Sequence, residues 1–338
     1  MKFLHISDLH IGKRVSECSM IEDQKYILKQ ILSIADQACA DAVLLAGDVY
    51  DKPVPSAEAV QVFDWFLTEL ADRDKKVFVV SGNHDSAERI AFGAQLMSGR
   101  GVYVSPVYNG RAAKVALTDG YGELFVWLLP FLKPAVVRHA LLAEPELCPP
   151  ESYQEAVALA IRRMDVDPNQ RNILVAHQFV TGAGRCESEE VLVGGLDNID
   201  AETFDGFDYV ALGHLHSPQS VGRGTVRYCG SPLKYSFSEA EQEKSVTVIE
   251  MKEKGTVELD TVPLKPLHDL HILRGTYEEV MSKQFYQDMD TEAYVKIILT
   301  DEEDIPDGIR RLRVIYPNLM RLEYDNSRTR ENRAVEGA

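Results

Sequence analysis

Five short segments of the sequence end in side chains that bind metal ions or transfer protons. Each segment follows an apolar run, and its side chains are carboxylates, imidazoles or a carboxamide. Two divalent cations bound about 3.5–4 Å apart need a carboxylate that bridges them. Imidazole combined with carboxylate and amide oxygen suits Mn, Fe or Zn better than Ca. The residues are Asp8 and His10 in "SDLH", Asp48 in "GDVYD", Asn83 and His84 in "SGNHD", His177 in "VAHQ", and His214 and His216 in "GHLH".

The spacing within two of these segments predicts paired ligands. Asp8 and His10 are two residues apart, and so are His214 and His216. In extended backbone, residues two apart point to the same side, so each pair is expected to face one site. Taken singly, an Asp or a His after a strand is often only a turn or surface residue. The joint occurrence of five such segments favours a metal centre.

The surrounding sequence predicts the elements that must position these residues. In the first hundred residues, short apolar runs alternate with segments of helical periodicity, which is typical of parallel strands joined by helical crossovers. Ligands of such sheets bind beyond the carboxyl ends of the strands, where the polar segments lie. Glycines precede three of the proposed ligands and would let the backbone pass close to the cluster. The expected strands are 3–7, 42–46 and 76–80, and the expected helices are 26–40, 56–70 (with Ser56 as N-cap) and 86–97.

The second half of the sequence is richer in strand patterns. It predicts strands at 124–129, 173–176, 209–212, 226–229 and 245–251, with one helix at 151–164. We therefore expect an α/β fold with two mixed sheets packed together and flanked by helices. The proline-punctuated segment 262–269 predicts a boundary between a domain of residues 1–265 and a small α+β domain of residues 266–338. In the latter, a strand at 293–299 and a helix at 306–314 are expected.

Composition restricts the class of protein. The formal net charge is −17, which argues against a broad basic footprint for nucleic acid. Any DNA binding must therefore use a local site, a metal centre or a partner. The five cysteines lie far apart without a CxxC motif, as expected in a reducing cytoplasm. No apolar run of about 18 residues predicts a membrane span, and the N-terminus does not resemble a secretory signal.

The ordered motifs resemble those of a known family. The set D-x-H, G-D-x-x-D, G-N-H-D, H and G-H-x-H is similar to the signature of the calcineurin-like binuclear metallophosphoesterases. "GNHDSAER", "LGHLHSPQ" and "YCGSPLKYSFSE" further resemble the SbcD family, the nuclease subunits of bacterial SbcC–SbcD complexes. Residues 266–338 resemble the capping domain of that family, which is an accessory to DNA binding.

This resemblance implies roles for individual residues. One metal ion would be held by Asp8, His10, Asp48 and His216, and the other by Asp48, Asn83, His177 and His214. His84, oriented by Asp85, would donate a proton to the leaving oxygen or stabilise its charge, while a hydroxide made available by the two ions attacks phosphorus. The helix that begins near Ser86 would direct its positive end toward the phosphate. Archaeal members tend to carry a His at the position of Asp51, so the role of Asp51 stays open.

The resemblance also implies an activity and partners. The expected function is Mn²⁺-dependent cleavage of DNA, as an exonuclease on double-stranded ends and an endonuclease on single strands and hairpins, in DNA repair, recombination and replication. The expected partners are DNA, an SbcC-like ATPase and a second copy of the chain, in the cytoplasm at the nucleoid. Two alternatives remain: a hydrolase of the same fold that acts on phosphomonoesters or small nucleotides, and a scaffold that has lost its metals.

Other polar and aromatic residues have simpler interpretations. His5 lies inside a strand and is expected in the core, while Phe179 and Tyr235 are expected to pack rather than to stack on bases. Four cationic residues are as compatible with a solvated surface as with phosphate binding. They are Arg14, Arg89, Arg223 and Lys234.

Overall fold

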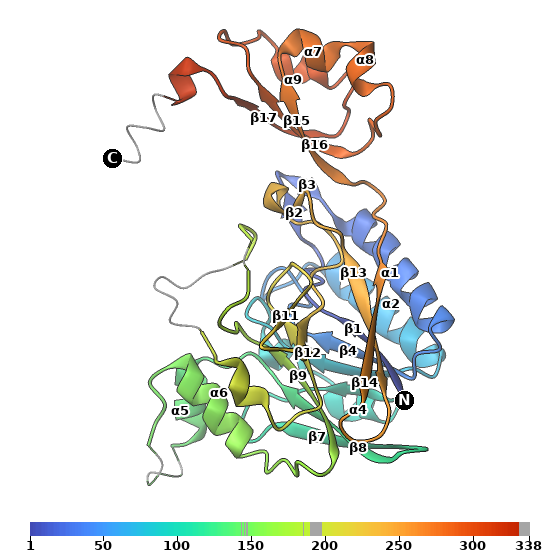
Figure 1. Cartoon of the computed structure of the whole chain (residues 1–338), viewed down its shortest axis with the longest axis vertical. Coiled ribbons are helices and arrows are strands. Elements are labelled where there is room, and N and C mark those ends of the chain that lie inside the picture. Colours follow the sequence, from blue (N-terminus) through green and yellow to red (C-terminus); the bar gives the residue numbers. More distant parts are fainter. Residues whose placement is uncertain (143, 145, 147, 185, 190–197, 331–338) are drawn as a thin grey trace.

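Two six-stranded sheets packed face to face form the main body of the protein (Figure 1). The computed structural model describes residues 1–142, 144, 146, 148–184, 186–189 and 198–330. Across the first sheet the strands are β14 (Val257–Pro263), β13 (Ser245–Met251), β1 (Lys2–Ile6), β4 (Ala42–Ala46), β5 (Lys76–Val80) and β6 (Val102–Val104). Across the second sheet they are β11 (Gln219–Val221), β12 (Arg223–Tyr228), β10 (Tyr209–Gly213), β9 (Arg171–His177), β8 (Gly122–Leu129) and β7 (Ala113–Asp119).

The central strands are buried on both faces, which explains their unbroken apolar sequences. Every residue of β4, β9 and β10 is buried. One hydrophobic cluster fills the space between the sheets and includes Leu44, Phe78, Ile173 and Tyr209. Within the first sheet β1, β4, β5 and β6 are parallel, and within the second β8, β9, β10 and β12 are parallel. The expected mixed two-sheet α/β architecture is therefore present.

Helices cover the outer faces of both sheets. Two long helices, α1 (Ile21–Gln37) and α2 (Ala57–Asp72), pack on the first sheet. The second sheet is covered by α5 (Pro134–Ala140) and α6 (Tyr153–Arg162). Ser56 caps α2 as expected, because its Oγ accepts a hydrogen bond from the Ala59 amide. No helix in the described part of the chain is long and apolar enough to cross a membrane.

Two helix predictions were wrong. The first helix begins at Ile21, five residues before the expected position 26, with acidic residues in its first turn that complement the helix dipole. The helix expected at 86–97 is instead two short helices, α3 (Ala87–Ile90) and α4 (Ala94–Ser98). Gly93 lies between them in a left-handed conformation (φ 75°) that ends the helical path. A four-residue helix after Ser86 has little dipole to direct at a phosphate, so its length does not support the expected role in phosphate binding.

The C-terminal residues form a separate small module with its own hydrophobic core (Figure 1). Its three strands are all parallel and alternate with short helices, so the module is α/β rather than α+β as expected. Residues 331–338, the end of the proposed 266–338 domain, lie outside the described residues. The elements are β15 (Leu270–Gly275), α7 (Tyr277–Met281), α8 (Lys283–Tyr286), β16 (Tyr294–Leu299), α9 (Gly308–Leu312) and β17 (Leu319–Tyr324).

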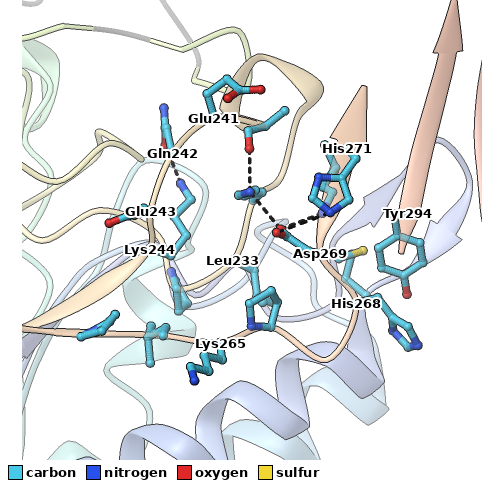
Figure 2. Close-up of a pocket in the computed structure, with 18 residues that line it drawn as sticks. Leu233, Glu241, Gln242, Glu243, Lys244, Lys265, His268, Asp269, His271 and Tyr294 are labelled. Carbon is cyan, nitrogen blue, oxygen red and sulfur yellow. Dashed lines mark hydrogen bonds and ion pairs between the residues drawn. The ribbon is translucent and has the colours of Figure 1, made fainter. Parts of the chain in front are cut away.

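A buried carboxylate of the main body holds the C-terminal module at the junction. Asp23, in the first turn of α1, accepts hydrogen bonds from the His268 amide (3.2 Å) and from the Tyr294 hydroxyl (2.7 Å). Lys234 forms an ion pair with Asp269 (2.9 Å). A cavity of about 570 Å³ lies between the two parts (Figure 2). The lining of this cavity includes none of the seven proposed metal ligands.

Candidate metal centre

The seven proposed ligands converge at one edge of the two sheets, where β1, β4, β5, β9 and β10 end. The spacing argument for the paired ligands was wrong, because the paired residues do not lie in extended backbone. Asp8 (φ 53°), His10 (φ 43°), Asp48 (φ 47°) and His214 (φ 106°) all have positive φ. Such conformations cost about 1–3 kcal/mol each and cluster at functional sites. Tight turns, rather than strand alternation, point these side chains at one another.

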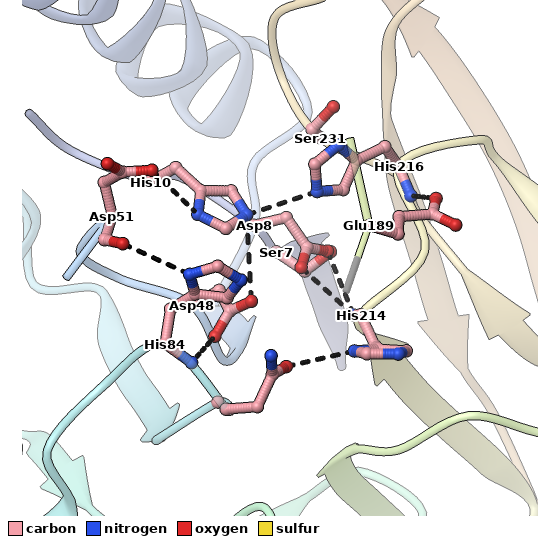
Figure 3. A network of polar contacts seen from close by, with 12 residues as sticks. Ser7, Asp8, His10, Asp48, Asp51, His84, Glu189, His214, His216 and Ser231 are labelled. Atoms are coloured by element: carbon pink, nitrogen blue, oxygen red, sulfur yellow. Dashed lines mark hydrogen bonds and ion pairs between the residues drawn. The ribbon is translucent and has the colours of Figure 1, made fainter. Parts of the chain in front are cut away.

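The first group of donor atoms comes from Asp8, His10 and His216, whose candidate ligand atoms all lie within 4.8 Å of one another. His10 Nε2 lies 3.2 Å from His216 Nε2 and 3.7 Å from Asp48 Oδ2 (Figure 3). His10 Nδ1 is buried and has no hydrogen-bond partner among the described residues. Two imidazole nitrogens facing each other need a proton or a cation between them, because their lone pairs repel.

The second group is centred on Asn83. Its Oδ1 lies 2.9 Å from His177 Nε2 and 3.0 Å from His214 Nδ1. His177 Nε2 also lies 3.3 Å from Asp48 Oδ2. The other nitrogen of His177, Nδ1, lies 2.8 Å from the Ala46 carbonyl oxygen, which can only accept a hydrogen bond. Nδ1 therefore carries a proton, and Nε2 is the atom available to a metal.

These distances suit divalent cations. Ligands at right angles around an ion and about 2.0–2.2 Å from it are about 3 Å apart. The spacings of 2.9–3.3 Å between donor atoms match this value. Asp48 contributes to both groups, because its carboxylate lies near His10 and near His177. The residues are therefore spaced so that they could hold divalent metal ions, and Asp48 is close to both groups of donor atoms.

Three glycines make this convergence possible, as expected from the sequence. A Cβ at Gly47 would lie 2.3 Å from His177 Nδ1, and one at Gly82 would lie 2.0 Å from Asp48 Oδ1. At Gly213 it would lie 1.8 Å from the Ala46 carbonyl oxygen. No side chain fits at these separations, so any substitution would push the ligand loops apart.

Burial and opposite charges perturb the titration of the cluster. Burial opposes ionisation of His177, but the Asp48 carboxylate outweighs it and raises the pKa of His177 to about 9. The same attraction outweighs burial at Asp48 and holds the pKa of that carboxyl well below its ordinary range. At His10, burial dominates and lowers the pKa. Without metal, the second group therefore holds an imidazolium–carboxylate pair.

His84 and Asp85 lie beside the cluster, but they are not paired with each other as expected. The His84 amide donates to Asp48 Oδ1 (2.9 Å), and its Nδ1 lies 3.1 Å from the Asp51 carbonyl oxygen (Figure 3). Asp85 instead accepts hydrogen bonds from the amides of Val49, Tyr50 and Gly82 (2.9–3.1 Å). Burial, followed by repulsion from Asp48, raises the pKa of Asp85 to about 6. Asp85 thus stabilises the turn that follows Asp48. The Asp51 carbonyl group orients the imidazole of His84.

Two buried residues that the sequence analysis did not assign to the site hold the turn around His10. Gln24 donates to the carbonyl oxygens of His10 (2.7 Å) and Leu9 (3.2 Å), and its own oxygen accepts from the Gly12 amide. The Tyr235 hydroxyl donates to the Leu9 carbonyl oxygen at 2.5 Å. The only signals in the sequence are a Gln placed next to Asp23 and a Tyr inside "YCGSPLKYSFSE". Neither reveals a contact more than ten residues away.

The other histidine, aromatic and cationic residues considered in the sequence are buried, paired or exposed. His5, Phe179 and Tyr235 are buried, as predicted for packing residues. Arg223 hydrogen-bonds to Asp205 and to two backbone carbonyl groups, and Lys234 is paired as described above. Arg14 and Arg89 are exposed.

Comparison with known proteins agrees with this geometry. The family model described as calcineurin-like phosphoesterase matches residues 1–218. The chain therefore belongs to the calcineurin-like phosphoesterases. A second model, described as type 5 capsule protein repressor C-terminal domain, matches residues 266–338. Among individual relatives, the SbcD subunit of the nuclease SbcCD from Staphylococcus epidermidis is 32% identical over 95% of this chain and 85% of its own. Within the phosphoesterases, the chain is a member of the SbcD family.

Further matches include a second SbcD protein and several solved structures. The SbcD subunit of the nuclease SbcCD from Staphylococcus saprophyticus is 31% identical over 95% of this chain and 84% of its own. TT1561 of Thermus thermophilus matches 77% of this chain and 98% of its own, with 13% identity and a TM-score of 0.42. A dimetal phosphatase from Danio rerio matches 78% and 99%, with 13% identity and a TM-score of 0.43.

Proposed function

We propose that this chain is a DNA nuclease that uses two divalent metal ions, Mn²⁺ in the preferred case. It would act as an exonuclease on double-stranded ends and as an endonuclease on single strands and hairpins, in repair, recombination and replication of DNA. The observation that carries this proposal is the pair of donor groups that share Asp48. The two SbcD relatives, both named as nucleases, supply the substrate class.

The ligands proposed for one ion are Asp8, His10, Asp48 and His216, and those for the other are Asp48, Asn83, His177 and His214. When bound, such a pair of ions supplies Lewis-acid stabilisation of the phosphoryl charge and a nucleophile at neutral pH. The protein's own contribution is to fix seven side chains close together before substrate binds. The tight turns at Asp8, His10 and Asp48 and the glycines beside them provide this rigidity.

His84 is proposed as the group that protonates the leaving oxygen. Its Nδ1 faces the Asp51 carbonyl oxygen, which can only accept, so Nδ1 keeps its proton. Nε2 is then the atom that carries the transferable proton. One ring nitrogen of His84 lies within 4.8 Å of the candidate ligand atoms of His10 and Asp48, so the imidazole would lie next to the reacting phosphate. Asp85 supports the reaction through the Asp48 turn rather than through His84.

The proposed partners are DNA, an SbcC-like ATPase and a second copy of this chain, in the cytoplasm at the nucleoid. An apolar surface on α2 and α4 supports the homodimer. Leu96 of α4 is 86% exposed and lines a cavity with Leu67 and Ala71 of α2. Phe92, in the turn before α4, is 85% exposed. Large apolar side chains gathered in this way are typical of interfaces. Leu96→Glu should convert a dimer into a monomer in light scattering, and unchanged mass would count against this surface.

A cleavage assay with the full chain tests the function. Purified protein with Mn²⁺ is given blunt duplex DNA, a DNA hairpin, single-stranded DNA and p-nitrophenyl phosphate, with and without the ATPase partner. We expect cleavage of DNA that chelation abolishes, and little release of p-nitrophenol. Preferential hydrolysis of p-nitrophenyl phosphate would instead support a phosphomonoesterase. Wild type that cleaves no phosphoester with any divalent ion would support a non-catalytic scaffold.

A further inference from the structure

A buried network of polar side chains contacts the face of His216 that points away from the candidate metal centre. His216 Nδ1 lies 2.9 Å from Ser188 Oγ and 3.3 Å from Glu239 Oε1. The His216 amide donates to Glu189 Oε1 at 2.7 Å (Figure 3). Glu239 is completely buried. These contacts come from two segments on either side of the His214–His216 turn, so they are not a consequence of local sequence.

Proton counting within this network defines the state of His216. The Ser188 hydroxyl has one proton, and it donates that proton to Glu239 Oε1 at 2.5 Å. Toward His216 Nδ1 the same oxygen can therefore only accept. Nδ1 must then carry a proton, which leaves the lone pair of the neutral ring on Nε2. Nε2 is the atom that lies 3.2 Å from His10 Nε2, inside the metal centre.

A buried lysine compensates the charge of Glu239. Lys244 Nζ lies 2.5 Å from Glu239 Oε2, and both side chains are almost completely buried (3% and 0% exposed). The same ammonium group donates to the His216 carbonyl oxygen (2.8 Å) and to Ser231 Oγ (3.0 Å). An unpaired carboxylate in this place would be strongly unfavourable, whereas a paired and hydrogen-bonded one is tolerated. Lys244 therefore permits a charged acceptor directly behind His216.

We propose that Glu239 is a positioning residue for metal binding, which acts on His216 directly and through Ser188. It holds the imidazole in the tautomer and orientation that present Nε2 to the ion, and Lys244 keeps the carboxylate charged. Carboxylates behind a ligating histidine also increase the basicity of the ligand. This inference rests on the proposed function only in that His216 binds a metal ion. It adds a determinant of affinity for one of the two ions.

Metal binding, measured apart from catalysis, tests the proposal. Wild type, Glu239→Gln and the control Glu241→Gln are titrated with Mn²⁺ by calorimetry, and the metal content is measured after dialysis. Glu241 is exposed and two residues away, so its substitution makes the same charge change without touching His216. We expect Glu239→Gln to lower the affinity for one of the two Mn²⁺ ions about 10–100-fold and to leave the affinity for the other unchanged. Wild-type affinity in Glu239→Gln would overturn the proposal.

A double-mutant comparison separates a positioning role from a general loss of structure. If Glu239 acts through His216, the variants His216→Ala and Glu239→Gln/His216→Ala bind Mn²⁺ equally well. If Glu239→Gln/His216→Ala instead bound Mn²⁺ more weakly than His216→Ala, Glu239 would not act through His216. Because Glu239→Gln leaves Lys244 charged and unpaired, Glu239→Gln/Lys244→Met is measured beside it. That double variant should unfold at a temperature near that of wild type and should still bind one of the two Mn²⁺ ions more weakly than wild type. Recovery of wild-type affinity for that ion would contradict the proposal.

The outcomes for the two proposals can be told apart. Wild type that binds two Mn²⁺ ions but cleaves no DNA refutes the nuclease and leaves the titration comparison valid. Wild type that binds no divalent ion overturns both. Wild type that cleaves DNA while Glu239→Gln binds Mn²⁺ normally refutes only the positioning role.

Discussion

His177 and Asp48 come within 3.3 Å of each other from strands that belong to different sheets. Asp48 follows β4 in the first sheet, and His177 ends β9 in the second. Their contact therefore joins the two halves of the main body at the point where a metal ion is proposed to bind. It also gives the metal-free protein a buried ion pair, with consequences that can be measured.

Binding of divalent ions should release a proton from His177. Its pKa of about 9 means that the imidazole is charged at neutral pH without metal, and only the neutral ring can ligate. Mn²⁺ affinity should therefore rise about tenfold per pH unit between pH 6 and 8 from this group alone. Calorimetry in buffers of different ionisation enthalpy counts the released protons. The His177→Gln variant should release about one proton fewer than wild type when it binds Mn²⁺. An unchanged number of released protons would contradict this assignment.

The same ion pair should make the stability of the metal-free protein depend on pH. The pKa of His177 is raised from 6.5 to about 9 on folding. Its contribution to the free energy of unfolding, on the order of 3 kcal/mol, is fully present below pH 6.5 and is lost as the pH rises through 9. Urea unfolding in the presence of a chelator at pH 6, 7.5 and 9 measures this loss. His177→Asn should show a flatter profile over this window.

His84→Ala should lower the rate of DNA cleavage and keep the metals. A general acid contributes about 10²–10⁴-fold when the leaving group is a poor one, such as a deoxyribose oxygen. With bis(p-nitrophenyl) phosphate the leaving group needs no proton, so the loss should be much smaller. Rates on both substrates and bound Mn²⁺ per chain are the measurements. An equal loss on both substrates would argue that His84 does not donate a proton.

Asp85→Ala should loosen the Asp48 turn. It removes the acceptor of three backbone amides, and each buried donor left unpaired costs about 1–3 kcal/mol. We expect a lower melting temperature together with weaker Mn²⁺ binding. Asp85→Asn retains one acceptor oxygen and should lie between Ala and wild type in both properties. If Asp85 acted on His84 instead, Asp85→Ala would slow cleavage without weakening metal binding.

The sequence predicted eight of the twelve strands of the two sheets and the set of chemical residues, because both depend on local patterns. The four strands that it missed, β6, β7, β11 and β14, are the edge strands of the two sheets. "AVLLA" is β4 with the bounds that its apolar run gives, and "KVFVV" is β5. The structure brings all seven proposed ligands close together. Ordered motifs after apolar runs were sufficient for this, since parallel strands place their carboxyl ends at a common edge.

The sequence could not predict how these residues are held. The positive φ of Asp8 and His10 depends on amide hydrogen bonds to the Gly47 and Asp48 carbonyl oxygens, which lie about forty residues away. The Val49 and Tyr50 amides that donate to Asp85, and the His216 ring that contacts Glu239, are likewise distant from those carboxylates in sequence. The break at Gly93 was missed because helical periodicity continues across it. The periodicity of apolar side chains predicts which residues are buried in the core. It does not predict the turns that bring the proposed ligands together.

Asp23 and Gln24 are neighbours in α1, yet they serve different parts of the molecule. The first accepts hydrogen bonds from His268 and Tyr294 of the C-terminal module, and the second supports the His10 carbonyl. A chain shortened before residue 266 would leave the Asp23 carboxylate without those donors. Gln24, which supports the His10 carbonyl, is the next residue in the chain. Loss of activity on such truncation would therefore not measure lost DNA contacts alone. Keeping the module and substituting its surface separates the two effects.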